Sequence, residues 1–155
     1  MIVIITIIEE ILIAAPVEVC FDASRDIQLH TKTVWPLTRE IIVSDRKTGL
    51  LEHNELITFE ARHLGIRQQL TSKVAEYMYP NYFVDVMQKG AFKQLSHQHE
   101  FEQHSNGTLV RDILQFQSPY GWIGSFIDAI VLKHYMRSFL RYRQRSLKEY
   151  IENSM

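Results

Sequence analysis

The sequence predicts an α+β domain in which a curved antiparallel sheet of about seven strands wraps around one long C-terminal helix. Three patterns predict this fold class: an N-terminal run rich in β-branched residues, a series of β-forming runs separated by turn signals over residues 39–116, and a proline-free stretch from Tyr120 to about Asn153. The 155 residues suit one domain, and no long linker, internal repeat or low-complexity tract divides them. We therefore expect a single domain over residues 1–155.

The N-terminal run, residues 1–8, predicts a long first strand that stops near Pro16. A membrane-spanning helix needs about 20 apolar residues, and this run is followed at once by Glu9 and Glu10. A signal peptide needs a basic start, which the run lacks. The single cysteine, Cys20, excludes an intrachain disulfide and a multi-cysteine zinc finger. These features favour a cytoplasmic location.

Two short helices are expected after this strand. The first covers about Val17–Phe21 and the second about Arg25–Thr33, with Asp22 and Ser24 as candidate N-cap residues.

The middle of the chain predicts an antiparallel meander of about six strands. Its turn signals are Lys47-Thr48-Gly49, Leu64-Gly65, Tyr79-Pro80-Asn81, Lys89-Gly90 and Asn106-Gly107. The Asn106-Gly107 pair predicts a type I′ hairpin turn, in which both central residues have positive φ. The Lys89-Gly90 connection requires a three-residue loop or a bulge if Met87 and Leu95 are to share a face.

The C-terminal stretch predicts one helix of about seven turns with a wide apolar face to bury. The positions of this face are Ile123, Phe126, Ile127, Ile130, Met136, Phe139, Leu140, Leu147 and Ile151.

The charge pattern excludes one class of function. Seventeen basic and eighteen acidic residues give a net charge of -1, so no overall positive field attracts nucleic acid, and we expect no nucleic-acid partner. The final helix nevertheless carries a basic run without acidic residues: Lys133, Arg137, Arg141, Arg143, Arg145 and Lys148. We interpret this run as a solvated helix face. The alternative is transient contact with an acidic partner or an anionic membrane surface.

Strand periodicity predicts which side chains face the interior, because each turn fixes the parity of the next strand. The predicted inner face is mostly apolar but carries five ionisable groups. It gives these candidate ligand-binding residues: Phe59, His63, Leu70, Phe83, Asp85, Met87, His97, His99, Phe101, Asp112, Leu114 and Phe116. In this prediction Val74 pairs near Phe83. A mostly apolar wall with a few convergent polar groups is typical of a small-molecule pocket.

Three interpretations of the ionisable groups remain open. They could form a structural network satisfied by carboxylates, backbone and water, or they could anchor the polar end of an apolar ligand. They could also bind a metal, because His97-Gln98-His99 places two imidazoles on one strand face with Asp85 or Asp112 as a third ligand. We expect neither a resident metal nor a cofactor, since the sequence carries no cofactor-binding motif.

The chain resembles the START-like SRPBCC superfamily, and within it the bacterial polyketide cyclase/dehydrase-like members. The resemblance spans nearly the whole chain and rests on residues Ala15–Val19, Thr58–Gln68, Lys89–Phe92, His97–Phe101, Asn106–Leu109 and Ser118–Gly121. It implies the helix-grip fold, in which a curved sheet grips the last helix.

The inner face and the resemblance together predict the binding of a hydrophobic small molecule, such as a lipid, a polyketide-like or an aromatic compound, between the sheet and the C-terminal helix. The alternative is a cyclase- or dehydrase-type enzyme in which a cavity histidine, oriented by an aspartate, transfers a proton. The sequence does not decide whether a reaction is catalysed, and it leaves the oligomeric state open.

Overall fold

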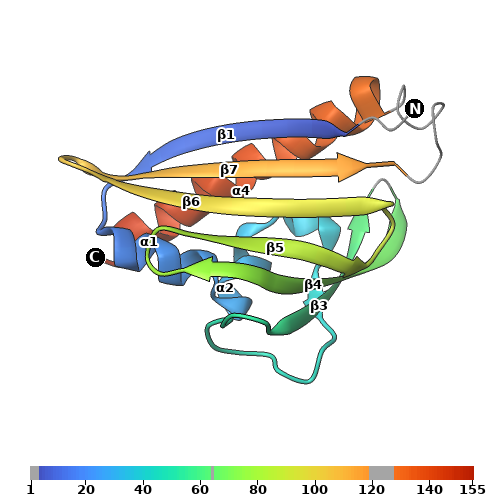
Figure 1. Ribbon diagram of the computed structural model, residues 1–155, viewed down its shortest axis with the longest axis horizontal. Coiled ribbons are helices and arrows are strands. Elements are labelled where there is room, and N and C mark those ends of the chain that lie inside the picture. The colour runs from blue at the N-terminus through green and yellow to red at the C-terminus, as the bar shows by residue number, and fades with distance from the viewer. Residues whose placement is uncertain (1–3, 64, 119–127) are drawn as a thin grey trace.

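The computed structural model describes residues 4–63, 65–118 and 128–155 and contains a seven-stranded sheet with helices on one side (Figure 1). The strands are β1 (Ile5–Ile13), β2 (Ile41–Ile42), β3 (Leu56–His63), β4 (Ile66–Met78), β5 (Tyr82–Lys89), β6 (Gln94–His104) and β7 (Gly107–Gln117). The helices are α1 (Val17–Ser24), α2 (Ile27–Thr33) and α4 (Lys133–Asn153), with a 3-10 turn η1 (Pro36–Thr38) and a π-helical turn η2 (Asp128–Leu132).

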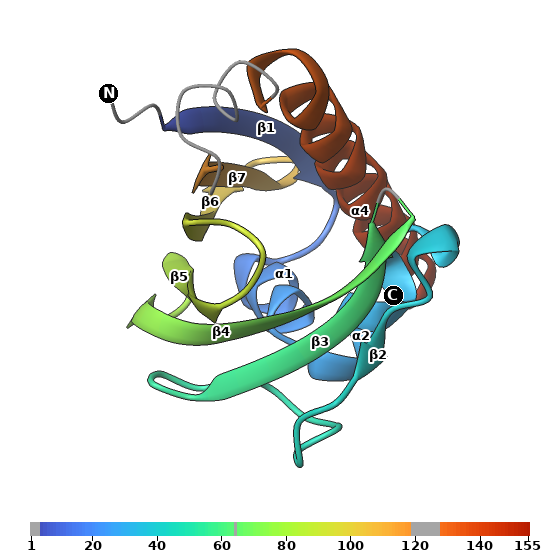
Figure 2. The ribbon, with the colours of Figure 1, turned by 90° about the vertical axis from the view of Figure 1, so that its right-hand side faces the viewer.

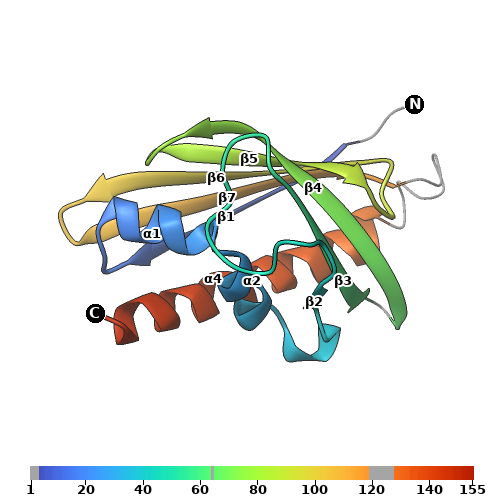
Figure 3. The same cartoon turned by 90° about the horizontal axis from the view of Figure 1, so that it is seen from below.

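The strand order is β1-β7-β6-β5-β4-β3-β2, and every neighbouring pair is antiparallel. The sheet curls so that α4 lies across its open side (Figure 2). Seen from below, α1, α2 and α4 all lie on this concave side (Figure 3). The predicted α+β helix-grip arrangement is confirmed.

The strand registers confirm the predicted faces but correct two details. Val74 pairs with Asp85 and Tyr77 pairs with Phe83, because the ladder is irregular between Val74 and Glu76. The expected pairing of Val74 near Phe83 is therefore wrong. The irregularity changes the parity of β4, which lets Val74 and Tyr77 both face inward with Phe83.

The second correction concerns the hairpin between β6 and β7. His104 pairs with Gly107, so Ser105 and Asn106 are the turn residues, and only Gly107 has a positive φ, of 139°. The predicted type I′ turn at Asn106-Gly107 is wrong, because the turn residues lie one position earlier and neither of them has the positive φ of a type I′ turn. Each residue of β6 therefore pairs with a residue of β7 two positions earlier than predicted, and a shift of two positions leaves every side chain on its predicted face. Gly107 is needed because a Cβ there would overlap the carbonyl oxygen of Ile13.

The N-cap of α2 also differs from the prediction. Helix α1 continues through Ser24, so Asp22 and Ser24 lie inside it and cap nothing. The side chain of Asp26 instead accepts a hydrogen bond of 2.9 Å from the backbone N–H of Leu29.

Helix α4 ends at Asn153 as predicted, while the start expected at Tyr120 and the apolar positions 123, 126 and 127 lie outside the described residues. Leu140, Leu147 and Ile151 are buried as expected. Ile130 is 53% exposed, so its predicted burial is wrong. It lies in the π-helical turn, whose wider winding departs from the three- and four-residue spacing on which its predicted burial rested.

The interior consists of two hydrophobic clusters. The larger one lies against α1, α2 and the C-terminal half of α4 and includes Phe21, Phe83, Phe101 and Leu147. The smaller one contains Ile5, Ile7, Leu114, Phe116 and Leu140. On β7, Asp112 falls between Val110 of the first cluster and Leu114 of the second. A polar layer therefore separates the two clusters, and this layer is the candidate site.

Candidate functional site

Four of the five predicted ionisable residues meet in this layer, on the neighbouring strands β5, β6 and β7. His97 Nε2 lies 2.8 Å from Asp112 Oδ1, and His99 Nδ1 lies 3.1 Å from the same oxygen. The other ring nitrogen of His99, Nε2, lies 3.0 Å from Asp85 Oδ2. The two imidazoles stack with their centroids 3.8 Å apart. Strand pairing brings these residues together, since Asp85 is opposite His97 and His99 is opposite Asp112.

Burial and charge act on the two histidines in opposite directions. Both ring nitrogens of His99 face carboxylates, and although burial alone lowers its pKa, Asp112 and Asp85 raise it above the usual value. Burial and the neighbouring His99 lower the pKa of His97 to about 4, against the opposing effect of Asp112. His99 is therefore the cationic imidazole of the layer, and His97 is neutral at pH 7.

The aspartates are held in their charged forms. Burial alone raises the pKa of Asp112, but the bonds to His97 and His99 outweigh it and bring the pKa well below the ordinary value. Burial likewise raises the pKa of Asp85, and His99 more than compensates. Two carboxylates and one imidazolium thus occupy the layer, beside the neutral His97.

Helix α4 and strand β1 complete the layer with residues that the sequence reasoning missed. Gln144 Nε2 donates to Asp112 Oδ2 at 2.6 Å and to the backbone oxygen of Glu9 at 3.0 Å. The Glu9 carboxylate, which faces inward on β1, pairs with Arg137 and Arg141 at 3.0 Å each. Gln144 therefore ties α4 both to the polar layer and to the edge strand β1.

Whereas Arg141 and Arg145 of the basic run are exposed as expected, Arg143 is buried beside Gln144, which corrects the expectation for that residue. Its residue exposure is 4%, and Nη2 donates to the backbone oxygen of Ser24 at 3.4 Å. Burial alone raises the pKa of Glu40, but His30, at 2.8 Å, and Arg143 together hold that pKa below its usual value. Lys148 contacts Glu152 at 2.7 Å. Since Arg137 and Arg141 pair with Glu9, four of the six basic residues of this run form polar contacts with other residues of the chain.

His63 does not join the other ionisable groups. Its Nδ1 lies 2.8 Å from the hydroxyl of Tyr135 on α4, and its ring contacts Phe139 edge to face. Burial lowers its pKa. Among the hydrogen bonds and ion pairs of the described residues, none joins His63 to the polar layer. His63 therefore ties the end of β3 to the helix.

The predicted apolar residues divide into two groups by burial. Phe59, Phe83, Phe101, Leu114 and Phe116 are buried in the two clusters. Leu70 and Met87, with the neighbouring inner-face residue Leu95, are only partly buried. The polar side chains beside them are also accessible: Asp85 is 25% exposed and His97 19%, whereas His99 and Asp112 are 4% and 3% exposed. Solvent thus reaches one part of the concave face, which we call the open half: Leu70, Asp85, Met87, Leu95 and His97.

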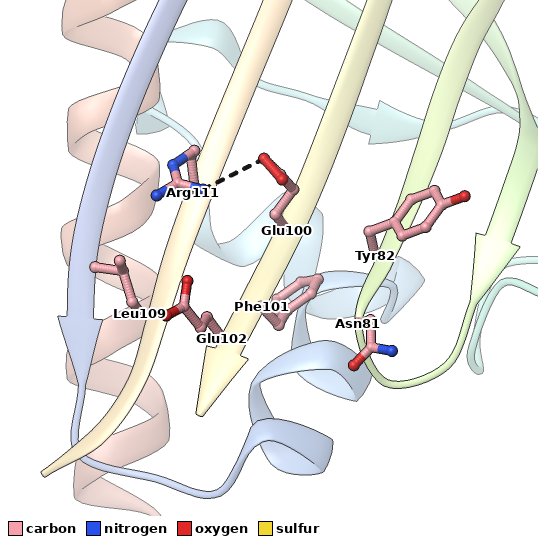
Figure 4. A pocket seen from close by; sticks show the side chains of 7 residues that line it. All are labelled: Asn81, Tyr82, Glu100, Phe101, Glu102, Leu109 and Arg111. Carbon is pink, nitrogen blue, oxygen red and sulfur yellow. Dashed lines mark ion pairs between the residues drawn. The ribbon is translucent and has the colours of Figure 1, made fainter. Parts of the chain in front are cut away.

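Two hollows in the described part of the chain lie elsewhere. One, of about 260 Å³, opens beside the outward-facing side chains of Glu100, Glu102 and Arg111 (Figure 4). The other, of about 490 Å³, lies between β1 and α4 and is lined by Glu9, Gln144 and other residues. The second hollow is at the β1 edge of the sheet and is lined by none of the predicted ligand-binding residues, and the first includes only Phe101 of them. The cavity predicted beside those residues therefore stays a prediction.

Comparison with known proteins gives the fold. No protein-family model matches the chain, and no curated protein matches its sequence. Solved structures do match. The protein TTHA0849 from Thermus thermophilus superposes with a TM-score of 0.72 at 17% identity, covering 97% of this chain and 99% of that one. A START superfamily protein from Mycobacterium smegmatis gives 0.71 at 12% identity, covering 97% and 99%.

A third match covers about half of the matched chain. The di-domain ARO/CYC StfQ from the steffimycin biosynthetic pathway gives a TM-score of 0.72 at 8% identity, covering 97% of this chain and 51% of that one. At these identities the likeness concerns the fold: the chain has the START-like helix-grip fold that the sequence predicted. No helix among the described residues is long and apolar enough to cross a membrane.

Proposed function

We propose that this helix-grip domain binds a hydrophobic small molecule between α4 and the open half of the concave face. The observation that carries the proposal is the uneven burial of the inner face. Leu70, Met87 and Leu95 stay partly exposed on a face whose other half is packed with buried aromatic rings. Apolar side chains that lie inside a fold and still meet solvent are the ones that a ligand would cover.

The polar end of the ligand would lie at Asp85 and His97. These are the two accessible members of the polar layer, at 25% and 19% exposure, and they lie opposite each other on β5 and β6. His97 uses Nε2 toward Asp112, so its Nδ1 is the atom available to a ligand. A lipid, a polyketide-like or an aromatic compound with one polar group has the matching chemistry. The helix-grip neighbours, which include a START superfamily protein and an ARO/CYC protein, are consistent with this class.

The affinity would come from the apolar contacts. Covering apolar surface contributes about 25 cal/mol per Å², so a lipid-sized molecule needs no charged anchor. Asp85 and His97 would instead select among ligands, because a mismatched polar group would leave them unsatisfied on binding.

A fluorescent apolar probe, 8-anilinonaphthalene-1-sulfonate, tests this location. We expect saturable binding to the native protein, and Met87→Glu to weaken it by about tenfold or more, since a carboxylate there opposes an apolar ligand. Met78→Glu is the matched control, because Met78 is 53% exposed at the end of β4. Equal binding by both variants would place the probe elsewhere and contradict the proposal.

The second candidate is a cyclase- or dehydrase-type enzyme. His97 paired with Asp112 has the arrangement of a general base with an orienting carboxylate. His99 is unsuited to this role, because both of its ring nitrogens face carboxylates. The low pKa of His97 makes it a weak base near neutral pH, which is why we rank catalysis below binding. Turnover of a polyketide-like substrate that disappears in a folded His97→Gln variant would reverse this ranking.

A further inference from the structure

We propose that His97, His99 and Asp112 form a binding site for one divalent transition-metal ion. The donor atoms all lie within 4.8 Å of one another. Two of their separations, 2.8 and 3.1 Å, join each imidazole to the same carboxylate oxygen. Around a tetrahedral ion with bonds of about 2.1 Å, ligand atoms lie roughly 3.4 Å apart. Small outward shifts of three side chains would therefore admit the ion at the point where the two imidazoles converge on Asp112.

The surrounding residues orient the ligands as in metal sites of known proteins. His99 presents Nδ1 to the site while its Nε2 lies 3.0 Å from Asp85 Oδ2, and such carboxylate–histidine pairs fix the ring of a metal-bound histidine. Gln144 donates to the other oxygen of Asp112 at 2.6 Å, which leaves Oδ1 for the ion. Each buried ligand thus has its remaining polar atom fixed by a second side chain.

The charge of the layer also favours a cation. Both carboxylates lie against a single imidazole, His99. On binding, His99 releases its Nδ1 proton to solvent and His97 moves its proton from Nε2 to Nδ1, so that both imidazoles coordinate as neutral groups.

Three protein ligands leave one coordination position open. His99 and Asp112 are buried, whereas His97 is 19% exposed toward the open half of the concave face. Nitrogen and carboxylate donors suit Zn²⁺, Co²⁺ or Fe²⁺ better than Mg²⁺ or Ca²⁺. The open position would take water or the polar atom of a bound molecule, but the site itself does not depend on the hydrophobic ligand.

Titration of the full chain with Co²⁺ tests the site, after removal of any metal with a chelator and without a histidine tag. We expect one Co²⁺ per chain, visible d–d absorption that saturates, and displacement by Zn²⁺. His97→Gln, which retains an N–H donor toward Asp112, should abolish the absorption while leaving the circular dichroism unchanged. Asp85→Asn should keep the stoichiometry and weaken the affinity by about 10–100-fold.

His104→Gln is the matched control, because His104 lies on the same strand, is 43% exposed and is no part of the site. It should bind Co²⁺ like the unmodified chain. Absence of saturable absorption in the unmodified chain, or absorption that survives His97→Gln, would overturn the proposal. Because the titration contains no organic ligand, its failure would leave the proposed function standing, and loss of probe binding would leave the metal site standing.

Discussion

Gln144 gives a sharp test of the polar layer, because it is the side chain that joins Asp112 to the backbone of β1. We consider Gln144→Met, which keeps the length of the side chain and removes its donor. The variant leaves Asp112 Oδ2 and the backbone oxygen of Glu9 without the bonds of 2.6 and 3.0 Å that they accept now.

The expected loss follows from these two bonds. A hydrogen bond to a charged group contributes roughly 1.5–3 kcal/mol and one to a neutral carbonyl about 1 kcal/mol. Greater apolar burial of methionine offsets roughly 1 kcal/mol of that sum. The free energy of unfolding should therefore fall by about 1.5–3 kcal/mol, which corresponds to a decrease in Tm of roughly 3–12 °C for a chain of this size.

Urea unfolding followed by circular dichroism measures the change, with the m-value checked for two-state behaviour. Arg145→Met is the control, because Arg145 is the exposed neighbour on α4 and should change stability by no more than about 0.5 kcal/mol. Gln144→Glu should cost more than Gln144→Met, since it sets a second carboxylate against Asp112. If Gln144→Met is as stable as the unmodified chain or more so, Gln144 does not hold the layer together and our reasoning is wrong.

Two further predictions concern other parts of the fold. Gly107→Ala should destabilise the protein by roughly 3 kcal/mol or more, because the added Cβ would overlap the Ile13 carbonyl. Gly65→Ala should cost only about 1–2 kcal/mol, because Gly65 also has a positive φ but has open space around it. Equal losses of stability in thermal unfolding would contradict the close approach of β1 to Gly107. The pKa of Glu40 is lower in the folded protein than in the unfolded chain, so its carboxylate stabilises the fold at pH values above the unfolded-state pKa. This contribution is lost as the pH falls through the pKa of Glu40 in the folded protein. Glu40→Gln should therefore be less stable than the unmodified chain near pH 7, with the difference shrinking at about pH 3; a difference independent of pH would contradict the assignment.

Strand periodicity was sufficient to predict the faces of the sheet. The alternation of β6 and β7 places His97, His99 and Asp112 inward whatever the exact turn, because a shift of two residues in the pairing preserves parity. The same argument could not choose between turns centred on Ser105-Asn106 and Asn106-Gly107. That choice depends on the carbonyl of Ile13, which only the folded chain brings next to Gly107.

The residues from α4 and β1 were harder to predict, although a signal existed. Arg143 lies three residues after Leu140 and four before Leu147, which places it on the buried helix face despite its charge. Composition alone suggested a solvated basic run. The role of Gln144 depends on how the helix crosses the sheet, which the sequence does not fix. Glu9 was interpreted as an interruption of an apolar run, yet the alternation of β1 places it on the inner face with Ile5 and Ile7, where Arg137 and Arg141 pair with it.

Native mass spectrometry tests ligand binding most directly. The protein would be purified without metal-affinity resin, and its native mass compared with that of the denatured chain, before and after incubation with a total lipid extract. We predict an added mass of several hundred daltons from a single organic molecule, absent from Met87→Glu and retained by Met78→Glu. Equal native and denatured masses under both conditions, or an increment of one metal ion alone, would contradict the binding of a hydrophobic molecule on the concave face.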